Sequence, residues 1–237
     1  MAVYKYETHL HTAEVSACGV SPAADYIEAY SNAGYAGIIV TDHFFNGNCG
    51  VNPFLSWEEK IDAFCLGCEN ALNAAKGTNF KVFFGIEYNF GGDEYLLYGL
   101  TKKHLKEMPQ IMEMTHAQLF EAINSVGGLM IQAHPFRRRS YIKEVRLHPK
   151  DVHGAEVYNA GNRMTENFEA IEYAKQNGLV MTSGSDIHNA ANLFSPEQAA
   201  AMGVNKTGGV AFNVPLETIE DYIAAIKTGT NYTLLGI

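Results

Sequence analysis

The chain alternates short apolar runs with amphipathic runs along most of its 237 residues. The apolar runs are typical of buried strands, and the candidates are 3–11, 36–43, 81–90, 94–100, 128–134, 154–160, 179–188 and 208–214. Strands that alternate with helices favour an α/β protein with a mainly parallel sheet. We therefore expect one domain over 1–237 that folds as a barrel, with an open doubly wound sheet as the alternative.

The amphipathic runs predict helices, and four of them end at glycine, a residue common at helix C-termini: 21–34, 115–128, 165–178 and 215–229. The run 56–76 is expected to form the longest helix. It contains Cys65 and Cys68 in the sequence CLGC. Because no second such pair occurs, we interpret them as buried helical residues and not as a redox or zinc pair.

The composition is that of a globular protein, with 47% hydrophobic and 18% charged residues and a net charge of -9. An acidic surface disfavours nucleic-acid polymers and anionic membranes. We find no secretory signal and no apolar stretch of the roughly 18 residues that a membrane span needs. These features predict a cytoplasmic protein with reduced thiols. They do not indicate its oligomeric state.

Side chains that bind metals gather at the C-terminal ends of the apolar runs. They are His9, His11, Asp42, His43, Glu87, His134, Glu156, Asp186 and His188. In an α/β barrel these strand ends converge on one face, where sites are built. Histidines in a hydrophobic core and carboxylates in solvent would not be expected to gather at the same end of six strands. The pattern predicts a metal centre at that face.

The spacing of these residues adds geometry. Residues two apart on a strand project to the same side, roughly 7 Å apart, so His9 and His11 can bind one cation together. Asp186 and His188 repeat this spacing. Asp42 and His43 are neighbours and would face opposite ways. We choose His43 as the ligand and expect Asp42 to orient it.

The motifs HLH, TDH, GIE, QAHP and GSDIH, in this order between Thr8 and His188, resemble the PHP (polymerase and histidinol phosphatase) superfamily. The run 215–229 resembles the terminal helix of that family, so most of the chain is covered. The resemblance implies a distorted (β/α)7 barrel with two or three divalent metal ions at the C-terminal ends of the strands. It also implies hydrolysis of phosphoesters by attack of a metal-bridging hydroxide.

The resemblance assigns ligands as well. A first metal would be surrounded by His9, His11, Glu87 and Asp186. Glu87 would bridge to a second metal, which His134 helps to hold, and a third would use His43 and His188. By the same resemblance, Glu87, Asp186 and His188 are the candidate catalytic residues.

Two positions depart from the family pattern. Family members often have aspartate or histidine before a glycine that follows the H-x-H pair, where this chain has Cys18 before Gly19. They also often have a histidine in the hairpin after the glutamate, where this chain has Tyr95. A thiolate is a good zinc ligand, but a carboxylate also suits manganese and iron. We therefore favour Glu14 over Cys18 as a ligand of the third metal.

Mixed imidazole and carboxylate ligands suit zinc, manganese or iron. The sequence HPFRRRS places Arg137, Arg138 and Arg139 directly after His134. Guanidinium groups match phosphate with two parallel hydrogen bonds. We expect Arg137, Arg138 and the more distant Arg163 to bind a small phosphorylated metabolite.

Three alternatives stay open. The substrate could be histidinol phosphate or a nucleotide, which the sequence does not separate. The chain could instead be a catalytically weak metal-binding or regulatory protein, for which the departures at Cys18 and Tyr95 are the only support. An amide-ring hydrolase has similar ligands but commonly uses a metal-bridging lysine, and no lysine stands at a strand end here.

Overall fold

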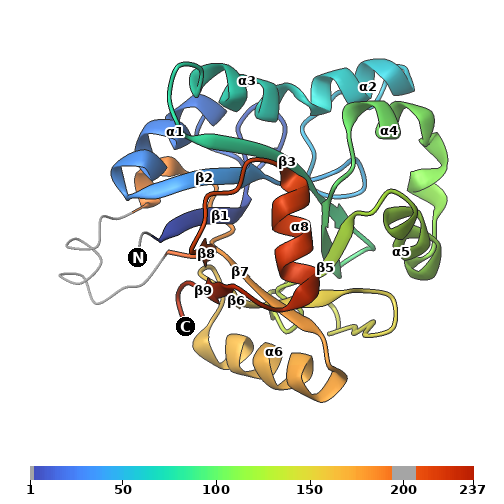
Figure 1. Ribbon diagram of the computed structural model, residues 1–237. Helices are drawn as coiled ribbons and strands as arrows, with labels where there is room; N and C mark the ends of the chain where they lie inside the picture. Colours follow the sequence, from blue (N-terminus) through green and yellow to red (C-terminus); the bar gives the residue numbers. More distant parts are fainter. Residues whose placement is uncertain (1–2, 194–206) are drawn as a thin grey trace.

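The computed structural model describes residues 3–193 and 207–237. Within them, one nearly closed sheet is surrounded by helices (Figure 1). The strands are β1 (Tyr4–Leu10), β2 (Tyr35–Val40), β3 (Lys81–Asn89), β4 (Glu94–Tyr98), β5 (Leu129–Ala133), β6 (Gly154–Asn159), β7 (Val180–Gly184), β8 (Val210–Phe212) and β9 (Tyr232–Leu234). The helices are α1 (Ala23–Asn32), α2 (Trp57–Phe64), α3 (Leu66–Ala74), α4 (Lys102–Glu107), α5 (His116–Ser125), α6 (Met164–Asn177) and α8 (Ile219–Thr228). Two short 3₁₀ helices span Pro109–Glu113 and Ala190–Asn192.

The sheet has nine strands in the order β7-β6-β5-β4-β3-β2-β1-β8-β9. The pairs β1–β2, β2–β3, β5–β6 and β6–β7 are parallel, whereas β4, β8 and β9 pair antiparallel with their neighbours. The expected α/β barrel-like architecture is thus confirmed. The sheet is mixed and not mainly parallel, and its nine strands do not by themselves define seven β/α units.

The segment after β7, the strand at one end of the sheet, meets β1 where the sequence pattern places the metal ligands. The amide of Asp186 donates to the carbonyl of His9 at 2.8 Å, and the amide of His11 donates to the carbonyl of Ile187 at 2.9 Å. The segment after β7 therefore continues the ladder beside β1. Because the H-x-H and D-x-H motifs lie on these two segments, closing the barrel brings them together.

Side chains that face into the barrel form one hydrophobic cluster with α8. Tyr98 at the end of β4 and Leu129 at the start of β5 belong to this cluster, together with Tyr222 and Ile223 of α8. The rings of Tyr98 and Tyr222 meet edge to face at 5.1 Å. Helix α8 thus covers the end of the barrel opposite the candidate ligands (Figure 1).

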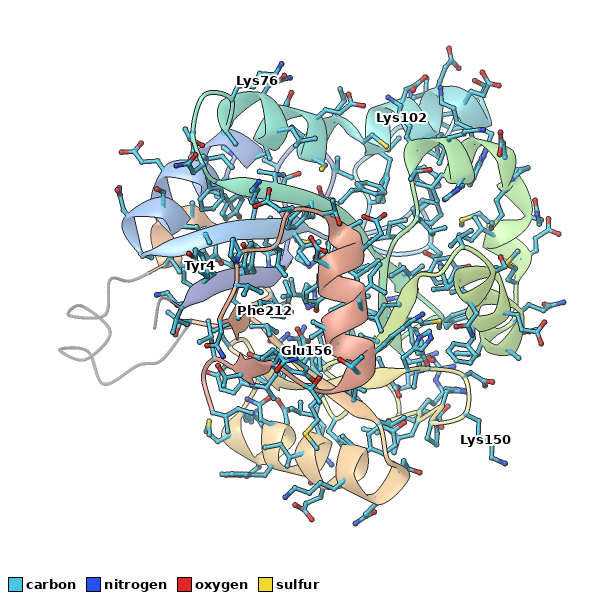
Figure 2. All side chains as sticks on the ribbon, in the orientation of Figure 1. Tyr4, Lys76, Lys102, Lys150, Glu156 and Phe212 are labelled. Atoms are coloured by element: carbon cyan, nitrogen blue, oxygen red, sulfur yellow. The ribbon has the colours of Figure 1, made fainter. Side chains whose placement is uncertain are left out.

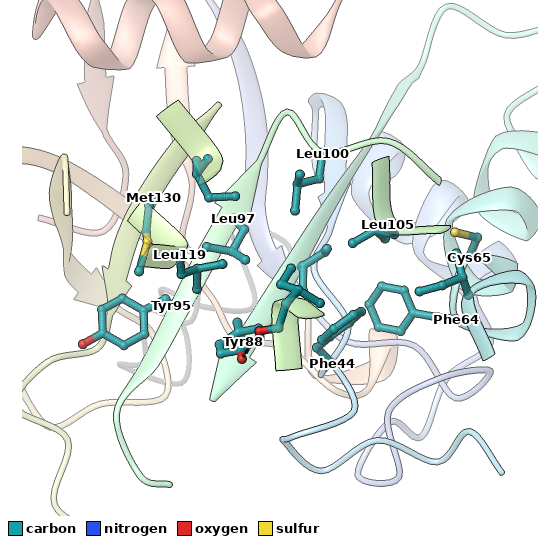
Figure 3. Close-up of a cluster of buried hydrophobic side chains, with 14 of the residues drawn as sticks. Phe44, Phe64, Cys65, Tyr88, Tyr95, Leu97, Leu100, Leu105, Leu119 and Met130 are labelled. Carbon is teal, nitrogen blue, oxygen red and sulfur yellow. Dashed lines mark hydrogen bonds between the residues drawn. The ribbon is translucent and has the colours of Figure 1, made fainter. Parts of the chain in front are cut away.

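A second cluster fills the space between the sheet and helices α2, α4 and α5 (Figure 3). Phe44, Phe64 and Leu105 lie on one side of it, and Tyr95 and Met130 on the other. Tyr95 is fully buried, and its hydroxyl donates to Asp93 at 2.9 Å. The tyrosine that stands at the family's histidine position is therefore a core residue.

Each predicted strand overlaps a strand of the structure, although β2 begins one residue before its predicted run, and β9 is an addition that the sequence did not reveal. The expected long helix over 56–76 is wrong, because Cys65 divides it into α2 with 8 residues and α3 with 9. Helix α6, with 14 residues, is longer. Cys65 and Cys68 are buried as expected, and burial raises the pKa of both thiols to about 12. Among the described helices, none is both long and apolar enough to cross a lipid bilayer.

Candidate metal centre

Glu87 of β3 lies at the middle of a buried group of imidazoles. Its Oε1 is 3.2 Å from Nε2 of His9 and 3.1 Å from Nε2 of His134. Its Oε2 is 2.7 Å from Nδ1 of His43 and 3.4 Å from Nε2 of His11. The carboxylate is 1% exposed, so it is removed from solvent with all four rings around it. This is the arrangement of a bridging ligand between neighbouring cations.

His9, His11 and Asp186 form the first group of donors. The two Nε2 atoms are 3.2 Å apart, and Oδ1 of Asp186 is 3.5 Å from that of His9 and 3.1 Å from that of His11. Donor atoms about 2.1 Å from a zinc ion at tetrahedral angles lie about 3.4 Å from one another. The spacing of these three atoms and Glu87 therefore fits one divalent cation.

A second group surrounds the other side of Glu87 and includes a residue that our sequence reasoning missed. Oε2 of Glu94 is 3.5 Å from Nε2 of His134, and its Oε1 is 4.0 Å from Nδ1 of His43. Glu94 begins β4, which runs antiparallel to β3, so the start of β4 lies at the same edge as the end of β3. Since strand side chains alternate, Glu94 faces the centre while Tyr95 faces the core.

The third group contains His11, His43 and His188, with a donor atom of each within 4.8 Å of the others. The rings of His43 and His188 stack on that of His11 at 4.2 and 4.4 Å. Burial raises the pKa of the Cys18 thiol, but His188 and His43 outweigh burial and lower this pKa to about 6.

The structure does not bring Glu14 into this group. Both of its carboxylate oxygens accept from the amide of Ala23, at 3.1 and 3.0 Å, and Oε1 also accepts from Asn70. Pro22 at the N-cap of α1 provides no capping side chain, so Glu14 takes that role from an earlier loop. The structure thus places the Glu14 carboxylate at the start of α1, and its role as a ligand of the third metal stays a prediction.

Buried polar groups fix the orientation of the ligand rings. Nδ1 of His9 donates to Glu156 at 2.9 Å, which leaves its Nε2 free to face the centre. Figure 2 labels Glu156 near the middle of the molecule. Nδ1 of His11 contacts the Ser16 hydroxyl at 3.2 Å, and that hydroxyl donates to Asp42 at 2.7 Å. Asp42 is therefore linked through Ser16 to the ring of His11, and not to the ring of His43 that we expected it to orient.

Two ligand candidates adopt a backbone conformation that is rare outside glycine. His134 has a φ of 29° and Asp186 a φ of 56°. Such conformations cost roughly 1–3 kcal/mol and concentrate at functional sites, where the surroundings hold them in place. His134 directly follows β5 and Asp186 lies two residues after the end of β7, so the turn at each position aims the side chain back into the barrel mouth.

The charges of the centre match a bound cation. Burial alone would raise the pKa of Glu87, but His43 and His9 hold it well below its usual range. Burial and then His43 lower the pKa of His11 to about 3. Within the described part of the chain, the buried atoms Nδ1 of His43 and Oε2 of Glu87 have no hydrogen-bond partner, although they are 2.7 Å apart. Two buried atoms that lack a hydrogen-bond partner are expected at a site where a bound metal ion is the partner of both.

The three candidate phosphate-binding arginines are placed differently. Nη1 of Arg137 lies 2.6 Å from Oδ2 of Asp186, and its side chain is 10% exposed. Arg138 instead pairs with Glu169 of α6 at 2.6 Å on the surface. Arg163 is exposed at the start of α6. Only Arg137, of these three, is brought to the centre.

A separate group contains Asp93, His116 and His148. Its carboxylate is already paired, because Asp93 lies 2.7 Å from Nε2 of His116 and 2.7 Å from Nη2 of Arg146. The rings of His116 and His148 stack at 3.7 Å. Because an arginine already pairs with the carboxylate, this network is better explained as a structural contact that holds the β3–β4 hairpin against the loop after β5.

Metal binding should stabilise the fold, because buried carboxylates and imidazoles are held close together without it. At a free metal concentration of 100 times Kd, the gain is about 2.7 kcal/mol, which for a chain of this size corresponds to about 5–10 °C in unfolding temperature. We expect Zn²⁺, Mn²⁺ or Fe²⁺ to give such a shift in a thermal melt of chelator-treated protein. Mg²⁺, which prefers oxygen ligands, is the control and should act less. Equal melts with every metal would contradict the centre.

Comparisons with known proteins agree with this geometry at the level of the fold. No family model and no curated protein matches the sequence. Among solved structures, the chain is similar to a two-domain protein from Bacteroides vulgatus that contains a predicted PHP-like metal-dependent phosphoesterase, with a TM-score of 0.70 and 15% identity. The match covers 98% of this chain and 64% of that one, so the chain spans less than two thirds of it. The chain has a PHP-like fold.

Two further solved structures are similar to this chain. A putative metal-dependent phosphoesterase from Bifidobacterium adolescentis matches with a TM-score of 0.55 and 14% identity, over 83% of this chain and 94% of that one. A lesion-specific endonuclease from Pyrococcus furiosus matches with a TM-score of 0.59 and 15% identity, over 99% of this chain and 58% of that one. These likenesses support the barrel-like α/β fold, whereas the (β/α)7 count that the sequence motifs imply stays a prediction.

Proposed function

We propose that this chain is a metal-dependent phosphoric ester hydrolase that acts on a small phosphorylated metabolite. The observation that carries the proposal is the position of Glu87, whose two oxygens face four imidazoles within 3.4 Å. The phosphoesterases and the endonuclease that share the fold support the same reaction class. The ions proposed are two or three of zinc, manganese or iron.

The residues of the centre would have different roles in hydrolysis. When bound, the ions activate water for attack on phosphorus and neutralise the charge of the phosphate oxygens. Glu87 and Asp186 provide the negative charge that holds the cations in a buried site. His9, His11 and His134 complete the donor set. His188 is 30% exposed and lies at the open side of the centre, where a leaving group would depart.

A small substrate is favoured over a polymer by two features. A cavity of about 150 Å³ opens beside Asp186 and His188 and is bordered by Gly161 and Ser185. The chain has a net charge of -9, which repels a polyanion at long range. The endonuclease among the structural neighbours makes nucleic acid the second candidate substrate.

The test is a panel of phosphate esters offered to metal-loaded protein. It contains sugar phosphates, histidinol phosphate, nucleoside 3′- and 5′-phosphates, an aryl phosphodiester and DNA oligonucleotides, with released phosphate or cleaved product measured. Glu87→Gln serves as the control for contaminating phosphatases. Turnover of monoesters supports the proposal. Cleavage of oligonucleotides alone would contradict the small substrate, and a loaded protein without any turnover would favour a metal-binding or regulatory role.

Arg137 is expected to matter in a way that differs from our sequence-based prediction. From the sequence, Arg137→Ala should weaken phosphate recognition more than it changes metal content. Because Arg137 lies 2.6 Å from Asp186, we now expect metal affinity to fall by about 10–100-fold as well. Arg138→Ala is the matched control and should change neither. Metal titrations and KM for the best monoester measure both effects, and equal behaviour of the two variants would exclude a role for Arg137.

A further inference from the structure

We propose that Glu7 is a positioning residue of the metal centre, because it joins the strand that carries His9 to the segment that carries Asp186. This inference rests on the metal centre of the proposed function and deepens it. Glu7 is fully buried on β1, yet it belongs to none of the groups of possible metal donors among the described residues. A buried carboxylate is costly unless hydrogen bonds compensate it, so its partners indicate its role.

The carboxylate of Glu7 contacts two parts of the chain that are far apart in sequence. Its Oε1 accepts from the amides of Thr8 and His9 at 2.9 and 3.0 Å, and from the amide of Ser185 at 2.9 Å. Its Oε2 accepts from the hydroxyl of Tyr30 on α1 at 2.7 Å. One oxygen therefore holds β1 and the segment after β7 together, and the other oxygen is fixed by a helix.

Strand β1 is irregular at the position where Glu7 acts. Between Glu7 and Leu10, β1 holds one residue more than the stretch of β2 that pairs with it. Such a bulge interrupts the ladder and changes the direction of the side chains beside it. The amides of Thr8 and His9 lie in this interval, and both donate to Glu7. The carboxylate therefore stabilises the bulge from which the ring of His9 projects.

The segment on the other side of Glu7 is held in a strained conformation. Asp186 has a φ of 56°, and the surroundings must hold such a residue in place. Its own amide donates to the carbonyl of His9 at 2.8 Å. The amide before it, that of Ser185, donates to Glu7. Gly184 allows this close approach, because a Cβ atom there would lie 2.5 Å from the Cβ of His9. Glu7 therefore helps to fix the turn that presents Asp186.

Glu7 thus acts on the separation of two donors of the first group. Nε2 of His9 lies 3.5 Å from Oδ1 of Asp186. Without the acceptor, the amides of both segments lose a shared partner, and the two donors are no longer held at this separation. Strand β1 still pairs with β2 and β8, so the sheet itself should persist. We therefore expect weaker metal binding in a protein that stays folded.

Cobalt reports on the geometry of the centre without an assay of activity. Co²⁺ added to chelator-treated wild-type protein should give visible d–d absorption. Glu7→Ala should bind the first Co²⁺ about tenfold more weakly and change the shape of this absorption. Glu7→Gln should keep both, because its amide oxygen can accept from the three amides while its NH₂ group donates to the hydroxyl of Tyr30. That hydroxyl can then donate to Oγ of Ser185, which lies 3.2 Å away. A metal ligand would not be replaced by glutamine in this way.

A second pair of variants tests the inference if Glu7→Ala does not fold. Tyr30→Phe removes the hydroxyl that donates to Glu7, whereas Tyr35→Phe removes a buried hydroxyl that donates to the carbonyl of Gly208. The two rings meet edge to face at 4.8 Å, so both variants change the same region. Tyr30→Phe should weaken Co²⁺ binding about threefold, as the loss of one hydrogen bond allows. Tyr35→Phe should leave affinity and absorption unchanged.

The outcomes separate this inference from the proposed function. No cobalt absorption in the wild type would contradict the metal centre itself, and this inference with it. Wild-type affinity and absorption in folded Glu7→Ala would overturn the positioning role and leave the proposed function standing. A loss in Glu7→Gln as large as that in Glu7→Ala would overturn it too. Equal affinities of Tyr30→Phe and Tyr35→Phe would have the same consequence.

Discussion

Glu87→Gln should abolish phosphate-ester hydrolysis and lower the metal content of the purified protein. Glu87 presents Oε1 to His9 and His134 and Oε2 to His43 and His11. Glutamine keeps one oxygen and replaces the other with an amide NH₂ group, which cannot bind a cation. One of the two sides of the centre therefore loses its bridging ligand, whichever way the amide turns.

The expected loss of activity for Glu87→Gln exceeds the loss for a residue that orients a ligand without contacting the metal. Removing a group that only orients a ligand typically costs about 10–100-fold in affinity or activity, so we expect more than about 100-fold in kcat/KM for Glu87→Gln. Elemental analysis should find at least one metal fewer per chain. Glu28→Gln, an exposed change on α1, is the matched control and should keep both values. Full activity of Glu87→Gln at wild-type metal content would remove the observation on which the proposed function depends.

The sequence could predict the strands because each is a locally apolar run, buried on both sides of a closed sheet. It could not predict how they pair. Whether β4 runs antiparallel between β3 and β5 depends on a tight hairpin and a long return connection, and these are settled by packing. β9 was missed because it has three residues, Tyr232–Leu234, none of them fully buried.

For the site, periodicity was a good guide where the chain is a regular strand. His9 and His11 share a face because they are two residues apart, and the structure brings both to Glu87. Glu94 could have been found by the same rule. It precedes Tyr95, so once tyrosine is assigned to the core, the glutamate must face the opposite way.

The loop after the H-x-H motif was beyond such reasoning. Glu14 and Cys18 both lie within reach of the centre along the chain, and carboxylate chemistry favoured Glu14. What decides their positions is the helix that follows, because α1 begins without a capping side chain at Pro22. Glu14 satisfies the amide of Ala23, which holds its carboxylate at the start of α1. Residue types alone cannot predict whether a carboxylate such as Glu14 binds the amide at the start of a helix or a metal ion.

Asp186→Asn is expected to lose hydrolysis while keeping the fold. The native residue has a φ of 56°, a left-handed conformation that asparagine tolerates better than most residues do, so the backbone should not move. The carboxylate, however, uses both oxygens: Oδ1 lies 3.1 Å from Nε2 of His11, and Oδ2 lies 2.6 Å from Nη1 of Arg137. An amide has one oxygen to serve both neighbours.

The position of Arg137 determines which way the amide oxygen of Asp186→Asn turns. A guanidinium only donates hydrogen bonds, so the amide oxygen of Asp186→Asn should turn toward Arg137 and its NH₂ group toward the cations. The first metal then faces a donor instead of an acceptor, and we expect a loss of more than about 100-fold in kcat/KM with reduced metal binding. Asp25→Asn, an exposed change on α1, is the control for isosteric replacement. The double variant Asp186→Asn with Arg137→Ala should recover part of the metal affinity, because the amide oxygen is released to face the centre. If the single variant keeps wild-type turnover, Asp186 is not a ligand, and if the double variant binds metal no better than the single one, Arg137 does not control its orientation.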